Sequence, residues 1–97
     1  MSKEVEQSVL EKIQAPGWTT PRAVVRTQTG DITQEDIRRV EKVMVAMARA
    51  GLVELWRLTL HADKSQMMAA ARPGFDLAKE LKDRQAWADA EPYSMDD

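Results

Sequence analysis

The stretch that most constrains the fold of this 97-residue chain is residues 33–72, TQEDIRRVEKVMVAMARAGLVELWRLTLHADKSQMMAAAR. It begins with Thr33 and Asp36, a helix-capping pair of the Thr-x-x-Asp kind, with the shorter acid in place of glutamate. Apolar residues then recur at helical spacing along one face: Ile37, Val40, Met44 and Met47, with Val43 and Ala48 at its edges. Gly51 is well placed to end this helix, because glycine takes the left-handed conformation readily. We therefore expect a long capped helix that leads directly into the next element.

That next element is predicted to be a two-stranded hairpin. Residues 52–60, LVELWRLTL, alternate and are rich in residues that favour strands. Residues 61–65 are the expected connection, and residues 66–72 are the expected returning strand. The run MMAAA favours a helix by intrinsic propensity. Its position between a turn and Pro73-Gly74 nevertheless favours a strand.

Shorter helices are expected on both sides of this unit. The first begins near residue 2 and ends at Pro16-Gly17. The second is opened by Thr20-Pro21, a hydroxyl cap followed by proline at the first helical position, and it extends to about residue 27. The last is expected over residues 75–88. The predicted fold class is therefore mainly α with a small β-hairpin (α+β), in the order helix, helix, helix, hairpin, helix.

Length and composition indicate a single domain over residues 1–88, followed by an acidic flexible tail over residues 89–97. The longest uninterrupted apolar run, residues 43–48, is far too short to span a bilayer. The first residues, MSKEVEQSVLEKI, carry acids and no apolar block, which argues against a secretory signal. The chain has no cysteine, which excludes disulfides and thiolate metal sites. We expect a cytoplasmic protein.

Nothing in the sequence indicates catalysis, a metal or a cofactor. His61 is the only histidine and lies at a predicted turn, without the cysteine or second histidine that a metal site needs. A surface histidine in a turn is the favoured interpretation. The four glycines are isolated, so no glycine-rich phosphate loop is present. We therefore expect a protein that is not an enzyme.

The charge distribution singles out one region. The whole chain carries a net charge of −2, which argues against a protein that coats nucleic acid indiscriminately. Residues 33–72 hold seven basic and five acidic side chains, whereas residues 73–97 hold three basic and seven acidic ones. Residues 1–32 are balanced, with four of each. Any contact with DNA is therefore expected within the helix–hairpin unit.

The junction MARAGLVEL after the third helix and the segment ARPGFDLAKEL after the hairpin carry a resemblance to a known family. Together with the order of elements, they make residues 2–88 similar to the winged helix-turn-helix superfamily of bacterial and archaeal DNA-binding regulators. No specific subfamily is matched. The resemblance implies a recognition helix over residues 33–50 and a wing over residues 52–72, with the wing tip at residues 61–65. It further implies that double-stranded DNA is the partner.

The side chains of the helix give this implication partial support. Arg38, Lys42 and Arg49 cluster in a narrow arc opposite the apolar face, and Arg39 lies on their flank. Arginine bonds guanine bidentately and glutamine bonds adenine, whereas glutamate accepts only from cytosine and is repelled by phosphate. The residues expected to contact DNA are Gln34, Glu35, Arg38, Arg39, Lys42, Arg49, Arg22, Arg26 and Lys64.

Two alternatives stay open. A helix that mixes acids and bases is often only a solvated face with local ion pairs. The acidic pI of about 5.4 and Glu35 in the reading position also suit a protein–protein interaction module or an accessory subunit that does not bind DNA. The stripe of Arg38, Lys42 and Arg49 instead favours the DNA-binding regulator.

The three tryptophans are expected to differ in role. Trp18 and Trp56 flank apolar segments and are expected to be core residues. Trp87 lies past the last clear core position of the closing helix. With Leu77, Leu81 and residues of the first helix, it is predicted to line a homodimer interface. The alternative is a Trp87 side chain that packs on the first helix of its own chain.

Overall fold

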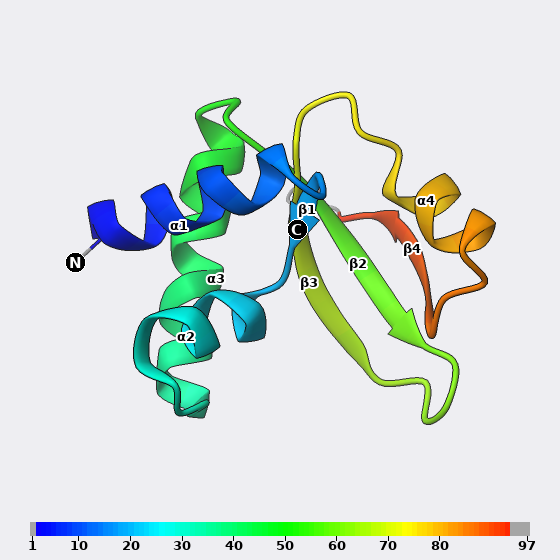
Figure 1. The fold of residues 1–97 in the computed structure, drawn as a ribbon, viewed down its shortest axis with the longest axis horizontal. Helices are drawn as coiled ribbons and strands as arrows, with labels where there is room; N and C mark the ends of the chain where they lie inside the picture. Colours follow the sequence, from blue (N-terminus) through cyan, green and yellow to red (C-terminus); the bar gives the residue numbers. More distant parts are fainter. Residues whose placement is uncertain (1, 94–97) are drawn as a thin grey trace.

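The computed structural model describes residues 2–93, and within them the chain is an α+β protein with four helices and one four-stranded antiparallel sheet (Figure 1). This confirms the mixed α and β class that the sequence predicts. The elements in chain order are α1 (Ser2–Gln14), β1 (Trp18–Thr19), α2 (Pro21–Thr29), α3 (Gln34–Arg49), β2 (Glu54–Leu60), β3 (Gln66–Ala71), α4 (Leu77–Asp83) and β4 (Ala88–Pro92).

The starts of α2 and α3 are set by local capping, as the sequence predicts. The Thr20 hydroxyl accepts a hydrogen bond from the backbone N–H of Ala23 at 3.3 Å, and proline occupies the first turn. The Thr33 hydroxyl accepts from the backbone N–H of Asp36 at 3.2 Å and donates to the Asp36 carboxylate at 2.9 Å. Each hydroxyl thus satisfies a backbone donor that has no partner inside the helix.

The end of α3 redirects the chain into the sheet. Ala50 caps the helix, and Gly51 follows with a φ of +79°, a conformation that favours glycine. The backbone N–H of Leu52 donates to the Met47 carbonyl at 2.9 Å, and that of Gly51 donates to the Ala48 carbonyl at 3.0 Å. These two bonds form a Schellman motif, which stops the helix and places β2 immediately after it.

The hairpin that follows α3 is the centre of the sheet, whose strand order is β1-β3-β2-β4. β2 and β3 pair from Thr59↔Gln66 to Glu54↔Ala71, and the short β1 pairs with the last two residues of β3. The predicted hairpin and its returning strand are therefore confirmed. Pairing on the sheet overrides the helix propensity of the MMAAA run, whose three alanines are fully buried.

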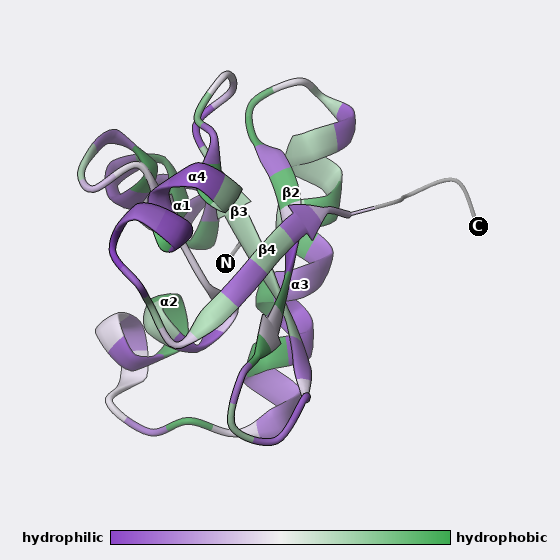
Figure 2. Ribbon diagram, turned by 90° about the vertical axis from the view of Figure 1, so that its right-hand side faces the viewer, coloured by the Kyte–Doolittle hydropathy of each residue, from purple (hydrophilic) through white to green (hydrophobic). Residues whose placement is uncertain are grey.

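The sheet lies between two helical layers, and each of its faces contributes to a separate core. Figure 1 shows α1, α2 and α3 together on one side of the sheet and α4 on the other. Figure 2, viewed from the α4 side, shows β4 in front of the helix α3. The core on the three-helix side contains Val5, Val9, Ile13, Val24, Val25, Val40, Met44, Met47, Val53, Leu55, Met68 and Ala70. The core on the α4 side contains Leu58, Ala69, Leu77, Leu81 and Ala88, with Trp18, Trp56, Met67 and Phe75 packed against it.

The end of the chain corrects the sequence prediction. The helix predicted over residues 75–88 extends only from Leu77 to Asp83, and Gln85 follows with a φ of +52°. The backbone N–H of Ala86 donates to the Leu81 carbonyl at 2.9 Å, which closes the helix as Gly51 closes α3. Glutamine is not a typical residue at this position, so the pattern carries no stop signal there.

Beyond that helix end, the predicted flexible tail begins with a strand. β4 pairs with β2 from Leu60↔Ala88 to Trp56↔Pro92, and Arg57 forms an ion pair with Glu91 across the two strands. Without β4, the backbone groups along this edge of β2 would have no strand partner. The domain therefore extends past the predicted boundary at residue 88. The last part of the predicted tail, residues 94–97, lies outside the described residues.

Candidate nucleic-acid interface

The outer face of α3 carries the basic stripe that the sequence predicts. Val40, Met44 and Met47 are buried on the inner face of this helix. Opposite them, Arg38, Lys42 and Arg49 are exposed. The three residues share a shallow hollow of about 440 Å³, whose lining is completed by Glu41, Val45 and Ala46.

None of the three cations in this stripe forms an ion pair within the described chain, and Glu41 is the one acid that lines their hollow. Within residues 2–93, no carboxylate lies within 4.0 Å of the charged groups of Arg38, Lys42 or Arg49. Arg39 behaves differently, because its guanidinium lies 3.5 Å from Asp36 and 3.9 Å from Glu35. Arg39 is thus engaged on its own helix, and the free positive charge of α3 resides in the other three residues.

The first turn of α3 is open to solvent. Gln34 is exposed, and the side chain of Glu35 is 87% exposed. Asp36 is held by both Thr33 and Arg39, so its charge is largely satisfied within the helix. The predicted reading positions are therefore accessible, although one of them carries a negative charge that phosphate repels.

The tip of the hairpin is ordered by Asp63. Its carboxylate accepts from the backbone N–H of Ser65 at 3.0 Å and from the Ser65 hydroxyl at 2.7 Å. These hydrogen bonds, the backbone one foremost, lower the pKa of Asp63. Lys64 lies between the two residues with a φ of +62° and is exposed. Figure 1 shows that the hairpin tip and the start of α3 lie at the same end of the molecule.

His61 lies at the start of this turn, where the sequence predicts a surface histidine. Its Nε2 atom lies 3.2 Å from a carboxylate oxygen of Asp89 in β4, and both side chains are at least half exposed. Within residues 2–93, no three His, Cys, Asp or Glu side chains form a group that could hold a metal ion. His61 thus tethers the hairpin tip to β4.

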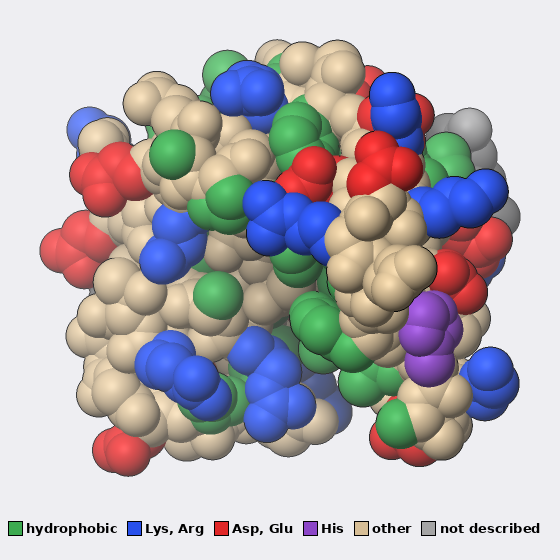
Figure 3. Space-filling model, turned by 45° about the vertical axis from the view of Figure 1, so that its right-hand side comes forward, with side chains coloured by type: hydrophobic (Ala, Val, Ile, Leu, Met, Phe, Trp, Pro, Cys, Tyr) green, Lys and Arg blue, Asp and Glu red, His purple; other side chains and the backbone are tan. Residues whose placement is uncertain are grey.

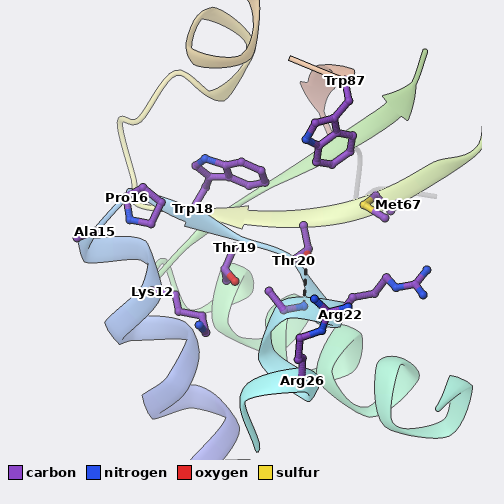
Figure 4. A pocket seen from close by; sticks show the side chains of 11 residues that line it. Lys12, Ala15, Pro16, Trp18, Thr19, Thr20, Arg22, Arg26, Met67 and Trp87 are labelled. Atoms are coloured by element: carbon purple, nitrogen blue, oxygen red, sulfur yellow. Dashed lines mark hydrogen bonds between the residues drawn. The ribbon is translucent and has the colours of Figure 1, made fainter. Parts of the chain in front are cut away.

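Arg22 and Arg26 do not lie in the α3 hollow. They line a separate cleft of about 450 Å³ with Lys12 of α1 and with Trp18, Met67 and Trp87 (Figure 4). The lining of this cleft includes none of the three α3 cations. Figure 3 shows basic side chains gathered over the helical part of one face, beside apolar side chains that reach the surface.

The predicted dimer interface needs a correction. Leu77 is fully buried and Leu81 is only 3% exposed, because both face the core on the α4 side of the sheet. Neither side chain is available to a second chain. Trp87, by contrast, is 52% exposed, because α4 ends before it and the chain turns into β4. The sequence predicts Trp87 near the end of the closing helix, whereas the structure places it outside any helix, where its side chain lines the cleft.

Trp18 and Trp56 are partly buried against the same core, which agrees with their predicted role as core residues. The sequence pattern gave no sign that Trp18 also faces the cleft with Trp87. The two residues are far apart in the chain, and only the pairing of β1 with β3 and the turn into β4 bring them to the same cleft.

No described helix is long and apolar enough to cross a membrane. The comparisons with known proteins assign the chain to no family: no family model matches it, and neither a curated protein nor a solved structure gives a significant match.

Proposed function

We propose that this protein is a DNA-binding transcriptional regulator of the winged-helix type, with α3 as the recognition helix and the β2–β3 hairpin as the wing. The observation that carries the proposal is the exposed stripe of Arg38, Lys42 and Arg49, which has no ion-pair partner within residues 2–93. Cations that are held on a rigid helix and left unpaired are well suited to phosphate and base edges. The succession of three helices and a hairpin supports the same assignment.

The dimensions of α3 fit this role. The helix has 16 residues, and its core-facing side packs against α1, α2 and the sheet. Residues 38 and 49 lie about 16 Å apart along the helix axis. The major groove is about 12 Å wide and admits one helix. Arg38, near the start of the helix, is placed for base contact, while Lys42 and Arg49 suit the phosphates.

The wing contributes less charge than the helix. Lys64 at the hairpin tip is exposed, but Asp63 beside it is ionised at neutral pH and partly offsets its charge. Glu35 and Asp36 lower the positive potential at the start of α3 in the same way. The proposed interface therefore makes few phosphate contacts, and we expect a modest dependence of affinity on salt.

The test is the binding of labelled duplex DNA, random and genomic, measured by fluorescence anisotropy at about 50 mM and about 200 mM salt. The variant Arg38→Ala/Lys42→Ala removes two cations from α3. Lys79→Ala/Lys82→Ala is the matched control, because it removes two exposed cations from α4, on the other side of the sheet. We expect the α3 variant to bind at least about tenfold more weakly and to lower the salt slope by up to about 1.8.

Two results would refute the proposal. One is the absence of binding by the unaltered protein at the lower salt concentration. The other is an α4 control that loses as much affinity as the α3 variant, because a nonspecific effect of net charge would then explain the loss. Circular dichroism of each variant separates a lost contact from a lost fold.

A second candidate function, a protein–protein interaction module, is favoured by one observation. Leu52 is 42% exposed and lines a hollow of about 310 Å³. The other lining residues are the apolar Val43, Ala46, Met47 and Ala50 and the charged Glu6 and Lys42. Contiguous apolar side chains rimmed by charged ones are typical of a surface that a partner covers. A protein that fails to bind DNA at low salt would favour this function over the first.

A further inference from the structure

We propose that the cleft between α1, α2 and β3 binds a small planar aromatic anion, a ring system that carries a carboxylate or a phosphate. The aromatic–basic cleft, as we name it, combines the indoles of Trp18 and Trp87 and the thioether of Met67 with three cations, Lys12, Arg22 and Arg26. This site lies outside the α3 surface and does not depend on the proposed DNA binding.

The apolar part of the cleft suits a flat ring. Figure 4 shows the side chains of Trp18 and Trp87 on the same side of the cleft, with Met67 nearby on β3. Trp18 is partly buried against the core, whereas Trp87 is 52% exposed. The backbone carbonyl of Trp87 accepts from the N–H of His61 at 2.9 Å, which fixes this residue against the end of β2. Two indoles that line one cleft, one of them half exposed, offer an apolar surface for a ring to cover.

The polar part of the cleft selects a negative charge. In Figure 4, Lys12, Arg22 and Arg26 extend from α1 and α2 on the side opposite the indoles. None of the residues that line the cleft is acidic. Over the described chain, none of these three cations has a carboxylate within 4.0 Å. Three unpaired cations around one cleft repel each other, and a bound anion relieves that repulsion.

The position of the two arginines strengthens this selection. Arg22 and Arg26 are four residues apart on α2, so they lie on one side of the helix. The first turn of α2 contains no acid, and its N-terminus faces the cleft through Thr20 and Ala23. The partial positive charge at a helix N-terminus adds to that of the guanidinium groups. Arginine also binds carboxylates and phosphates through paired hydrogen bonds.

The size of the cleft limits the ligand to a small molecule. Its volume of about 450 Å³ lies within the range typical of small-molecule sites, about 300–1,000 Å³. Such a volume accepts a mononucleotide or an aromatic carboxylate of two fused rings. The walls come from α1, β1, α2, β3 and the segment before β4, so the ligand contacts both helical and sheet layers.

The experiment titrates the full chain with two probes, adenosine monophosphate and 2-naphthoate, each compared with a neutral counterpart, adenosine and 2-naphthylmethanol. Binding is followed by ¹H–¹⁵N NMR and quantified by calorimetry. We expect at least one anion to shift the indole N–H signals of Trp18 and Trp87 saturably, with its neutral counterpart bound at least about tenfold more weakly. The two probes distinguish a nucleotide from an aromatic carboxylate.

Three variants localise the binding. Arg22→Ala/Arg26→Ala should lower the affinity for the anion by about tenfold or more. Trp87→Ala should lower this affinity by at least about fivefold. Trp87→Ala is expected to fold, because the side chain is half exposed. Lys79→Ala/Lys82→Ala removes the same charge from α4 and should leave the affinity unchanged. Arg38→Ala/Lys42→Ala should also leave it unchanged, which separates this proposal from the DNA proposal.

The proposal is overturned if neither anion gives saturable shifts at millimolar concentration, or if the Arg22→Ala/Arg26→Ala variant binds as well as the α4 control. It is also overturned if only duplex DNA shifts the cleft signals. In that case the cleft belongs to the DNA-binding surface, as the sequence predicts for its two arginines.

Discussion

Gly17, which precedes β1, is a position where the fold requires the absence of a side chain. Its φ is +123°, a conformation that residues with a side chain rarely adopt. A Cβ atom at this position would lie 2.7 Å from Cε1, 2.9 Å from Cδ1 and 3.1 Å from Cζ of Phe75. The carbonyl of Gly17 also accepts from the backbone N–H of Arg72 at 2.9 Å. The chain must therefore pass close to the Phe75 ring in order to place Trp18 on the sheet.

The cost of Gly17→Ala follows from these two features. The unfavourable backbone conformation costs about 1–3 kcal/mol, and displacing the partly buried Phe75 ring from the added methyl group costs up to about 3 kcal/mol more. We therefore expect a loss of about 1–6 kcal/mol in the free energy of unfolding, up to a large fraction of the stability of a small domain. Gly74→Ala is the matched control: its φ is +86°, but nothing lies within 4 Å of the added Cβ. Gly74→Ala should therefore lower the free energy of unfolding only by the backbone contribution, about 1–3 kcal/mol.

The assay is urea unfolding of the single variants Gly17→Ala, Gly74→Ala and Phe75→Ala and of the double variant Gly17→Ala/Phe75→Ala. Removal of the ring removes the overlap but not the backbone strain. The two substitutions should therefore couple by up to about 3 kcal/mol. A steric origin of the loss is excluded if Gly17→Ala lowers the free energy of unfolding no more than Gly74→Ala does, or if it lowers it equally with and without the Phe75 ring.

Two further predictions concern the hairpin tip and α4. Ser65→Ala should raise the pKa of Asp63 toward its ordinary value, because it removes one of the hydrogen bonds that lower it; carboxyl NMR titration measures the change. Since the folded-state pKa lies below the unfolded one, ionised Asp63 favours the folded tip at neutral pH, and this contribution is lost as the pH falls through the folded-state pKa. An unchanged midpoint in the variant would contradict this account. Leu77→Ala should lower the free energy of unfolding by about 2–5 kcal/mol, because the side chain is fully buried. Leu77→Ala should leave the sedimentation coefficient unchanged. A change in oligomeric state would instead support the predicted role of Leu77 in a dimer interface.

Local signals explain why the middle of the chain could be predicted. Thr33 caps α3 through a hydrogen bond from Asp36, three residues later, and Gly51 ends the same helix through a hydrogen bond to Ala48 in its last turn. Such interactions depend on residues that are close in sequence, so a pattern reveals them. The apolar side of α3 and its opposite basic stripe follow from the period of the helix alone.

The end of the chain could not be read in this way. α4 ends at Asp83, and Gln85 follows in a left-handed conformation. Glycine or asparagine is the usual residue at such a helix end, so the sequence contains no stop signal there. Residues 88–92, ADAEP, have an unremarkable composition for a tail, and they form a strand because one edge of β2 is open to them. The burial of Leu77 and Leu81 follows from the same arrangement, since α4 packs on the face of the sheet beside β4.

The amino-acid pattern alone places the bounds of the first three helices and of the two hairpin strands to within two residues, because caps, glycines and apolar periods act over a few residues. It also determined that the α3 stripe would be basic. The ion pairs of Arg39 with Glu35 and Asp36 are local as well, since these residues lie four and three positions away on one helix. The tertiary fold, by contrast, sets which side chains are buried, as Leu77 and Leu81 of α4 show. It alone forms the aromatic–basic cleft, because strand pairing brings Trp18 and Trp87 from distant parts of the chain to the same cleft.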